Sequence, residues 1–181
     1  MRLFIFTFTF ALIFAGMASI SAPVLAGDLQ PVAKYKAWRL FVAGEGGDKI
    51  CTIIAEPAAS TPKSVRRGDV FISVNHRPAQ QTFYEVAVQV GYPFSAISEP
   101  FATIDSNVFK FFSGVQAHND ADESAWLYHL EDAPKMIKAM RAGSALIFKG
   151  TSARGTLVED NYSLFGFTAA LAALDMACAQ L

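Results

Sequence analysis

The first 26 residues constrain the fold most, because they determine the compartment in which the remaining 155 residues fold. The chain starts with Met1-Arg2, continues with an apolar run over 3–14 and offers the small residues Val24-Leu25-Ala26 before a cleavage point. This order is typical of a secretory signal peptide. The unbroken apolar part is too short for a membrane span, so the sequence predicts cleavage of residues 1–26 and a mature chain from Gly27 with no transmembrane anchor. Retention of the segment as an anchor is the alternative.

Charge argues against a nucleic-acid partner. The chain has 15 Lys and Arg against 16 Asp and Glu, and loss of Arg2 with the leader leaves 14 against 16, a net charge of about −2. Nucleic-acid binding requires a clustered basic surface, which this balance does not indicate. Residues 27–181 have the usual length of one domain with its own core, so a single domain is predicted.

The sequence contains two cysteines, Cys51 and Cys178. An even number in an exported chain favours a disulfide between them, and a reactive thiol is the alternative. A zinc site would need Cys or His ligands at short spacing, but His76, His118 and His129 are scattered. No metal or cofactor is therefore predicted.

Eight short segments of alternating or continuous apolar residues predict a mainly β chain. Tight-turn residues separate several of them, as in Asp105-Ser106-Asn107. We expect an antiparallel β-sandwich or barrel-like fold of about eight strands. The segments are 38–42, 51–55, 70–74, 85–90, 101–104, 108–112, 126–129 and 145–148.

Two helices are expected between and after these strands. The first lies near 133–141, with Asp132 as its cap and Gly143 at its end. The second lies near 163–179 and is capped by Ser163. Its apolar residues recur every three or four positions and share one face: Leu164, Phe167, Leu171, Leu174 and Cys178.

The position of Cys178 on that apolar face directs its thiol at the sheet. Cys51 shares a strand face with Ile53 and Ala55, so the two sulfur atoms can meet. Such a disulfide would attach the last helix to an early strand.

The order and spacing of several motifs resemble the invasion associated locus B family of exported bacterial proteins. The resemblance covers nearly all of residues 27–181 and implies a periplasmic, outer-envelope or secreted protein, linked in some members to virulence and host-cell invasion, with no established catalytic reaction. The motifs are Trp38, Cys51, Val74-Asn75-His76-Arg77-Pro78, Gly91-Tyr92-Pro93-Phe94, Arg154-Gly155-Thr156, Asp160, Tyr162-Ser163-Leu164, Gly166-Phe167 and Cys178.

Arg154 and Asp160 are the candidate ligand or structural residues among these motifs. Arg154 is expected to be buried and to bond carbonyl groups or Asp160, and the alternative is a guanidinium fork presented to an anionic ligand. Asp160 and Ser163 are expected to hold the start of the last helix.

The remaining polar motifs are expected to be structural or solvated. His76 is predicted to be a hydrogen-bonded surface histidine. The acidic segment 118–123 lacks the glycine and distal glutamate of a calcium loop, so a solvated loop is expected. Arg67-Gly68-Asp69 matches a tripeptide used by integrin ligands, and it too is expected in a solvated loop. No Gly-x-Ser-x-Gly elbow occurs.

These observations predict an exported cell-envelope protein that acts by binding a protein, a glycan or an envelope component, and not an enzyme. The alternatives are a hydrolase-like envelope enzyme whose site the sequence does not reveal and a purely structural role. A polar pocket with converging ionisable groups would favour the enzyme, whereas an exposed apolar patch would favour binding.

Overall fold

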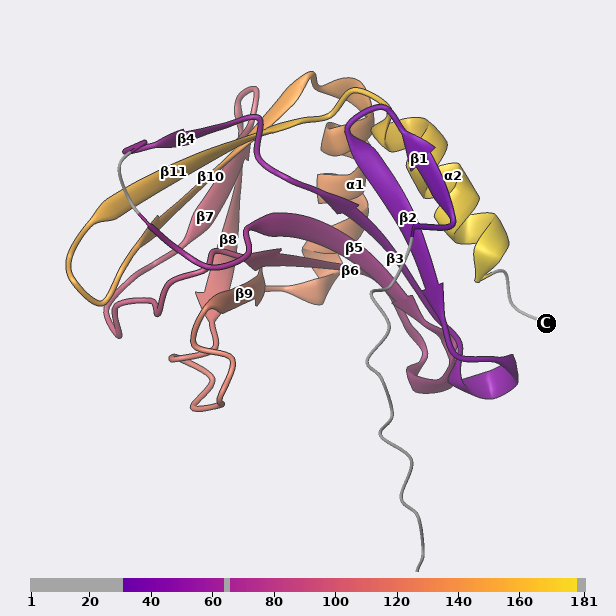
Figure 1. The fold of residues 1–181 in the computed structure, drawn as a ribbon, viewed down its shortest axis with the longest axis horizontal. Helices are drawn as coiled ribbons and strands as arrows, with labels where there is room; N and C mark the ends of the chain where they lie inside the picture. The colour runs from indigo at the N-terminus through magenta and orange to yellow at the C-terminus, as the bar shows by residue number, and fades with distance from the viewer. Residues whose placement is uncertain (1–30, 64–65, 179–181) are drawn as a thin grey trace, which may run out of the picture.

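The computed structural model describes residues 31–63 and 66–178 (Figure 1). The predicted signal peptide and the start at Gly27 lie outside these residues. The strands are β1 Ala33–Tyr35, β2 Trp38–Ala43, β3 Ile50–Ala55, β4 Ala59–Thr61, β5 Phe71–Arg77, β6 Thr82–Gln89, β7 Phe101–Ile104, β8 Asn107–Ser113, β9 Ser124–Leu127, β10 Ala145–Thr151 and β11 Leu157–Ser163. The α-helices are α1 Ala133–Ala142 and α2 Phe167–Ala177, and short 3-10 turns lie at Gly46–Asp48, Pro78–Gln80 and Leu130–Asp132.

All 11 strands form one antiparallel sheet in the order β1-β2-β3-β5-β6-β9-β8-β7-β10-β11-β4. The sheet curls into a half-barrel, which confirms the mainly β, barrel-like prediction. Strand β8 joins the two halves, because Asn107 to Lys110 pair with β7 and Phe111 to Ser113 pair with β9. Strand β8 therefore belongs to both halves of the curled sheet.

The eight predicted strands correspond to β2, β3 and β5 to β10, and the sequence missed β1, β4 and β11. Strands β1 and β4 have three residues each, too few to show a period. Strand β11 was overlooked because Asp160 stands at an inward position between Val158 and Tyr162, where an apolar residue is expected.

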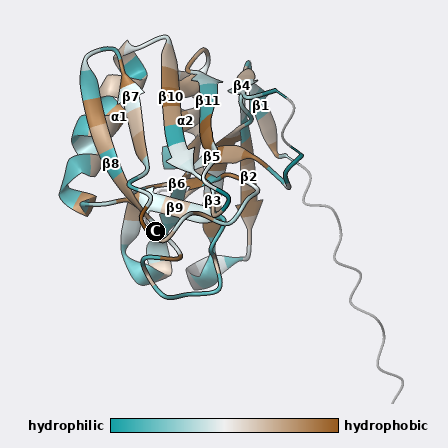
Figure 2. Cartoon of the chain, turned by 90° about the vertical axis from the view of Figure 1, so that its left-hand side faces the viewer, coloured by the Kyte–Doolittle hydropathy of each residue, from teal (hydrophilic) through white to brown (hydrophobic). Residues whose placement is uncertain are grey.

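The inward side chains of both halves of the sheet share one hydrophobic core with the two helices. Helix α2 packs on β1, β2 and β3, while α1 packs on β6 and on α2. Trp38 is fully buried, and its indole N–H donates to the carbonyl of Ser163 at 3.1 Å. Figure 2 shows the alternation of apolar and polar residues along the strands that places one face in this core.

Helix α2 begins later than predicted. Ser163 is the last residue of β11 and caps no helix, and α2 starts at Phe167 after Gly166. Gly166 has φ +94°, and a Cβ there would lie 2.2 Å from the carbonyl oxygen of Tyr35. The close approach to Tyr35 therefore requires glycine. The apolar face itself is confirmed, because all five of its residues are buried: Leu164, Phe167, Leu171, Leu174 and Cys178.

Helix α1 agrees with its prediction to within one residue. Asp132 precedes the helix, as expected, but its side chain makes no capping hydrogen bond. Gly143 follows the helix, and its N–H donates to the carbonyl of Ala139 at 2.8 Å.

Candidate functional site

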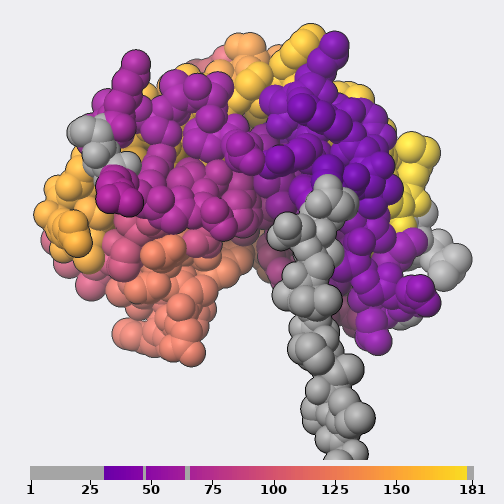
Figure 3. Space-filling view, in the orientation of Figure 1, coloured from indigo at the N-terminus to yellow at the C-terminus, as the bar shows by residue number. Residues whose placement is uncertain are grey.

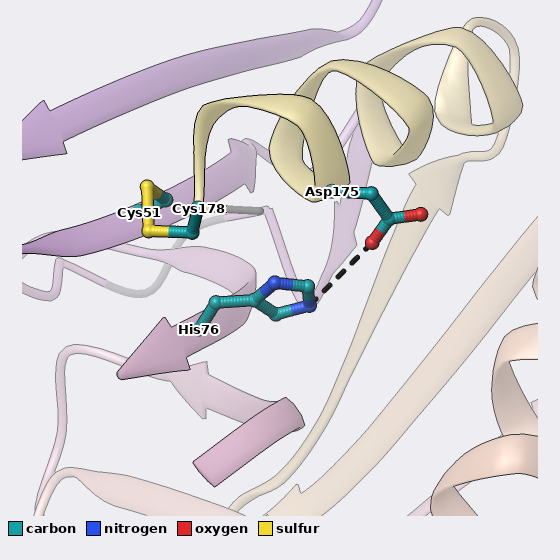
Figure 4. The surroundings of a disulfide bond; sticks show 4 residues. All are labelled: Cys51, His76, Asp175 and Cys178. Atoms are coloured by element: carbon teal, nitrogen blue, oxygen red, sulfur yellow. Dashed lines mark ion pairs between the residues drawn. A yellow bond between two sulfur atoms is a disulfide. The ribbon is translucent and has the colours of Figure 1, made fainter. Parts of the chain in front are cut away.

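The structure pairs Cys51 of β3 with Cys178 after α2, as the sequence predicts (Figure 4). The two Cα atoms lie 6.0 Å apart across a sequence separation of 127 residues. Both cysteines are buried. The bond attaches the end of the last helix to an early strand and leaves no thiol for chemistry, since the described chain has no free cysteine.

His76 lies beside this disulfide and is not the surface histidine that the sequence predicted. Its side chain is only 3% exposed, and neither ring nitrogen has a hydrogen-bond partner among the described residues. Nε2 lies 3.7 Å from Oδ1 of Asp175 on α2, as Figure 4 shows. Burial lowers the pKa of His76, and the nearby carboxylate of Asp175 opposes this shift only partly. The residues next to His76 in the sequence could not show that α2, which is distant in the sequence, packs beside the imidazole ring.

Asp160 does not hold the start of a helix, nor does it bond Arg154. It lies in β11 with 1% of its side chain exposed, and it forms a bidentate ion pair with Arg67. Arg67 Nη1 donates to Oδ2 at 2.8 Å, and the Ser60 hydroxyl donates to Oδ1 at 2.6 Å. The hydrogen bond to Asp160 raises the pKa of Arg67. This buried cluster joins β4, β11 and the segment before β5.

The tripeptide Arg67-Gly68-Asp69 lies in the loop before β5 with Gly68 and Asp69 exposed, as expected, but the Arg67 side chain is not solvated. The Arg67 side chain is 10% exposed because it reaches inward to Asp160. Gly68 packs on Gly91, to whose carbonyl its N–H donates at 2.9 Å, and a Cβ on Gly91 would come within 2.7 Å of Gly68. The guanidinium is therefore occupied inside the protein.

Arg154 is exposed instead of buried, and it lies in the tight turn between β10 and β11. The N–H groups of Gly155 and Thr156 both donate to Ser152, at 2.8 and 3.2 Å. The N–H of Ala153 donates to the carbonyl of Pro93 at 2.8 Å. These bonds bring two of the motifs that carry the resemblance, Gly91 to Phe94 and Arg154 to Thr156, to one cleft.

The cleft has a volume of about 490 Å³. Arg66 and Arg154 lie at it, together with Tyr92, Pro93, Ser152, Thr156 and Val158. None of its lining residues is acidic. Burial raises the pKa of Tyr92 and of Tyr162, whose hydroxyls lie near Asp160 and have no partner among the described residues. Both phenols are therefore neutral at physiological pH.

A second candidate is an outward-facing aromatic surface on β7, β8, β9 and the residue that follows β9. It is made by Phe101, Phe112, Trp126 and Tyr128 and is called here the aromatic face. Phe112 and Trp126 are cross-strand partners whose rings stack, with centroids 5.7 Å apart and planes at 28°. Tyr128 packs its ring edge on Phe112 at 6.2 Å and is 55% exposed.

A pocket of about 450 Å³ adjoins the aromatic face. Phe101, Tyr128 and His129 line it together with Lys110 and Glu99. The sequence reasoning missed this surface, although the outward positions of the predicted strands 108–112 and 126–129 carry its aromatic residues. Outward aromatics that alternate with buried residues were the available signal.

The other two histidine candidates, His118 and His129, are both exposed. His118 is exposed in the loop between β8 and β9, which projects at the lower edge of the face shown in Figure 3. His129 is exposed at the pocket beside the aromatic face. In residues 31–63 and 66–178 no three His, Cys, Asp or Glu side chains gather as metal ligands. No helix in the described part of the chain is long and apolar enough to cross a membrane.

Comparison with known proteins places the chain in a family. The family model described as invasion associated locus B (IalB) protein matches residues 38–175, and the chain belongs to this family. A solved structure, the invasion associated protein B from Bartonella henselae, has the same fold with a TM-score of 0.57 and 19% sequence identity, covering 80% of this chain and 94% of that one. No curated protein matches the chain significantly.

Proposed function

We propose that this chain is an exported protein of the cell envelope that acts by binding a partner through the aromatic face. The observation that carries the proposal is the exposed Tyr128 beside the stacked pair Phe112 and Trp126. Large aromatic side chains with polar tips are enriched in protein interfaces, because they bury much area at a small loss of conformational entropy. The adjoining pocket offers a recess for a projecting group of the partner.

The aromatic face differs from the isolated exposed apolar residues elsewhere on the protein. Val108 is 60% exposed on the same face of β8, and Leu130 is 66% exposed three residues after Leu127 of β9. Phe165 is also exposed, at 68%, and Lys36 Nζ lies 5.5 Å from the centroid of its ring. Contiguous apolar residues mark a contact site more strongly than single ones do.

Site-directed photocrosslinking tests this proposal. A photoreactive phenylalanine analogue at Tyr128 should give a defined crosslinked adduct in envelope or host-cell extracts, and the same analogue at Phe165 should not. Unlabelled wild type should compete for the adduct, whereas Tyr128→Ser and Phe112→Ser should not. Equal adducts from positions 128 and 165, or competition by both variants, would refute a role for the aromatic face.

Export is tested separately, by intact mass of the protein recovered from outside the cytoplasm. We expect a chain that begins at Gly27, because Val24 and Ala26 have the small side chains that precede a cleavage site. A recovered mass that includes residues 1–26 would show that the segment is an anchor.

The enzyme hypothesis predicts instead that the protein turns over a substrate and that this turnover depends on a particular residue. His76, the most buried candidate, is covered by α2, and both cysteines are bonded to each other. A binding role requires neither group to reach a substrate. Loss of function in a folded, exported histidine variant, together with measurable turnover by the wild type, would favour the enzyme.

A further inference from the structure

The pairing of the arginines sets one surface apart from the rest of the described chain. Four of its six arginines form ion pairs: Arg39 with Glu56, Arg67 with Asp160, Arg77 with Glu85 and Arg141 with Asp175. Within the described residues, Arg66 and Arg154 have neither an ion pair nor a side-chain hydrogen bond. Both are exposed, and both line the cleft beside Tyr92 and Pro93.

We propose that this cleft binds a phosphate monoester, with Arg66 and Arg154 as its two cationic contacts. Two unpaired guanidinium groups at a cleft that lacks acidic lining residues match a doubly charged oxyanion. Each guanidinium can donate two parallel N–H bonds to phosphate oxygens. The whole chain has a net charge of only −1, so the two arginines do not belong to a generally basic protein.

The backbone around Arg154 is fixed before any ligand binds. Its turn is held by the bonds from Gly155 and Thr156 to Ser152 and by the bond from Ala153 to Pro93. A rigid turn lowers the entropy that binding must overcome. Ser152 Oγ accepts the Thr156 N–H, so its own O–H remains available to donate to a bound oxygen.

The buried acid near Tyr92 does not counteract the proposed site. Asp160, close to Tyr92, is 1% exposed and forms an ion pair with Arg67. Val158 and the ring of Tyr92 give the cleft apolar surface that suits the organic part of a phosphorylated ligand. The cleft shares no lining residue with the pocket at the aromatic face, so the two sites can be tested independently.

The first test is a titration of the ¹⁵N-labelled protein, residues 27–181, with inorganic phosphate and with phenyl phosphate. Saturable shifts should appear at Arg154, Thr156 and the backbone around Tyr92. Arg154→Ala and Arg66→Ala should each weaken binding about tenfold or more, as expected for a lost charged hydrogen bond, and the double variant should show no saturable shift. Lys138→Ala removes one exposed charge from α1 and should bind like wild type.

Vesicles distinguish a lipid headgroup from a soluble phosphate. Sedimentation with phosphatidic acid vesicles, but not phosphatidylcholine vesicles, which is lost in the double variant, would assign the monoester to a lipid. Phosphate binding without sedimentation would assign it to a soluble ligand. Both arginines are exposed, so the variants should keep the melting temperature of wild type. Absence of saturable shifts in wild type, or equal shifts in the double variant, would overturn the proposal.

Discussion

Removing Arg67 should destabilise the protein far more than removing Arg154, although the sequence suggested Asp160 as one possible partner of Arg154. Arg67→Ala leaves the carboxylate of Asp160 1% exposed without its cation. Breaking a buried ion pair by deleting one partner costs about 3 to 5 kcal/mol, because the remaining charge stays desolvated. For a chain of this size that corresponds to a fall in melting temperature of about 6 to 20 °C.

Urea unfolding followed by circular dichroism measures this cost. Arg154→Ala is the matched control, since it removes the same side chain from an exposed turn and should change the free energy of unfolding by less than about 0.5 kcal/mol. The double variant Arg67→Met with Asp160→Leu should recover most of the stability, because no buried charge remains. A loss below about 1 kcal/mol in Arg67→Ala, or a larger loss in Arg154→Ala, would refute the assignment.

Three further predictions follow from the core. Replacing Cys51 and Cys178 with Ser should lower the free energy of unfolding by at most about 4 to 5 kcal/mol in the chain-entropy model, and a reductant should then destabilise wild type but not this variant. Because burial lowers the pKa of His76, protonation favours the unfolded chain, so stability should be full above about pH 6.5 and should decline as the pH falls toward the lowered value. His76→Leu should flatten that decline in urea titrations at several pH values, and an unchanged slope would contradict it. Gly166→Ala should cost more than about 1 kcal/mol in thermal unfolding, because its φ of +94° is strained for alanine and its Cβ would meet the Tyr35 carbonyl; a smaller loss would show that the chain relaxes there.

Local patterns in the sequence were sufficient for much of the fold. Alternating residues such as the valines at 86, 88 and 90 defined strands, because a strand places every second side chain on one face. The apolar spacing that ends at Cys178 defined the buried face of α2 and, with Cys51, the disulfide. These features depend on neighbours within one element, which a sequence displays directly.

Only the tertiary structure decided the sites. Asp160 meets Arg67 across 93 residues, and α2 covers His76 with Asp175 across 99, so neither contact has a local signature. The same pairing left Arg154 without the buried partner that its motif suggested. Burial is a property of how elements pack, and it determines whether a charged or titratable side chain is structural or available to a ligand.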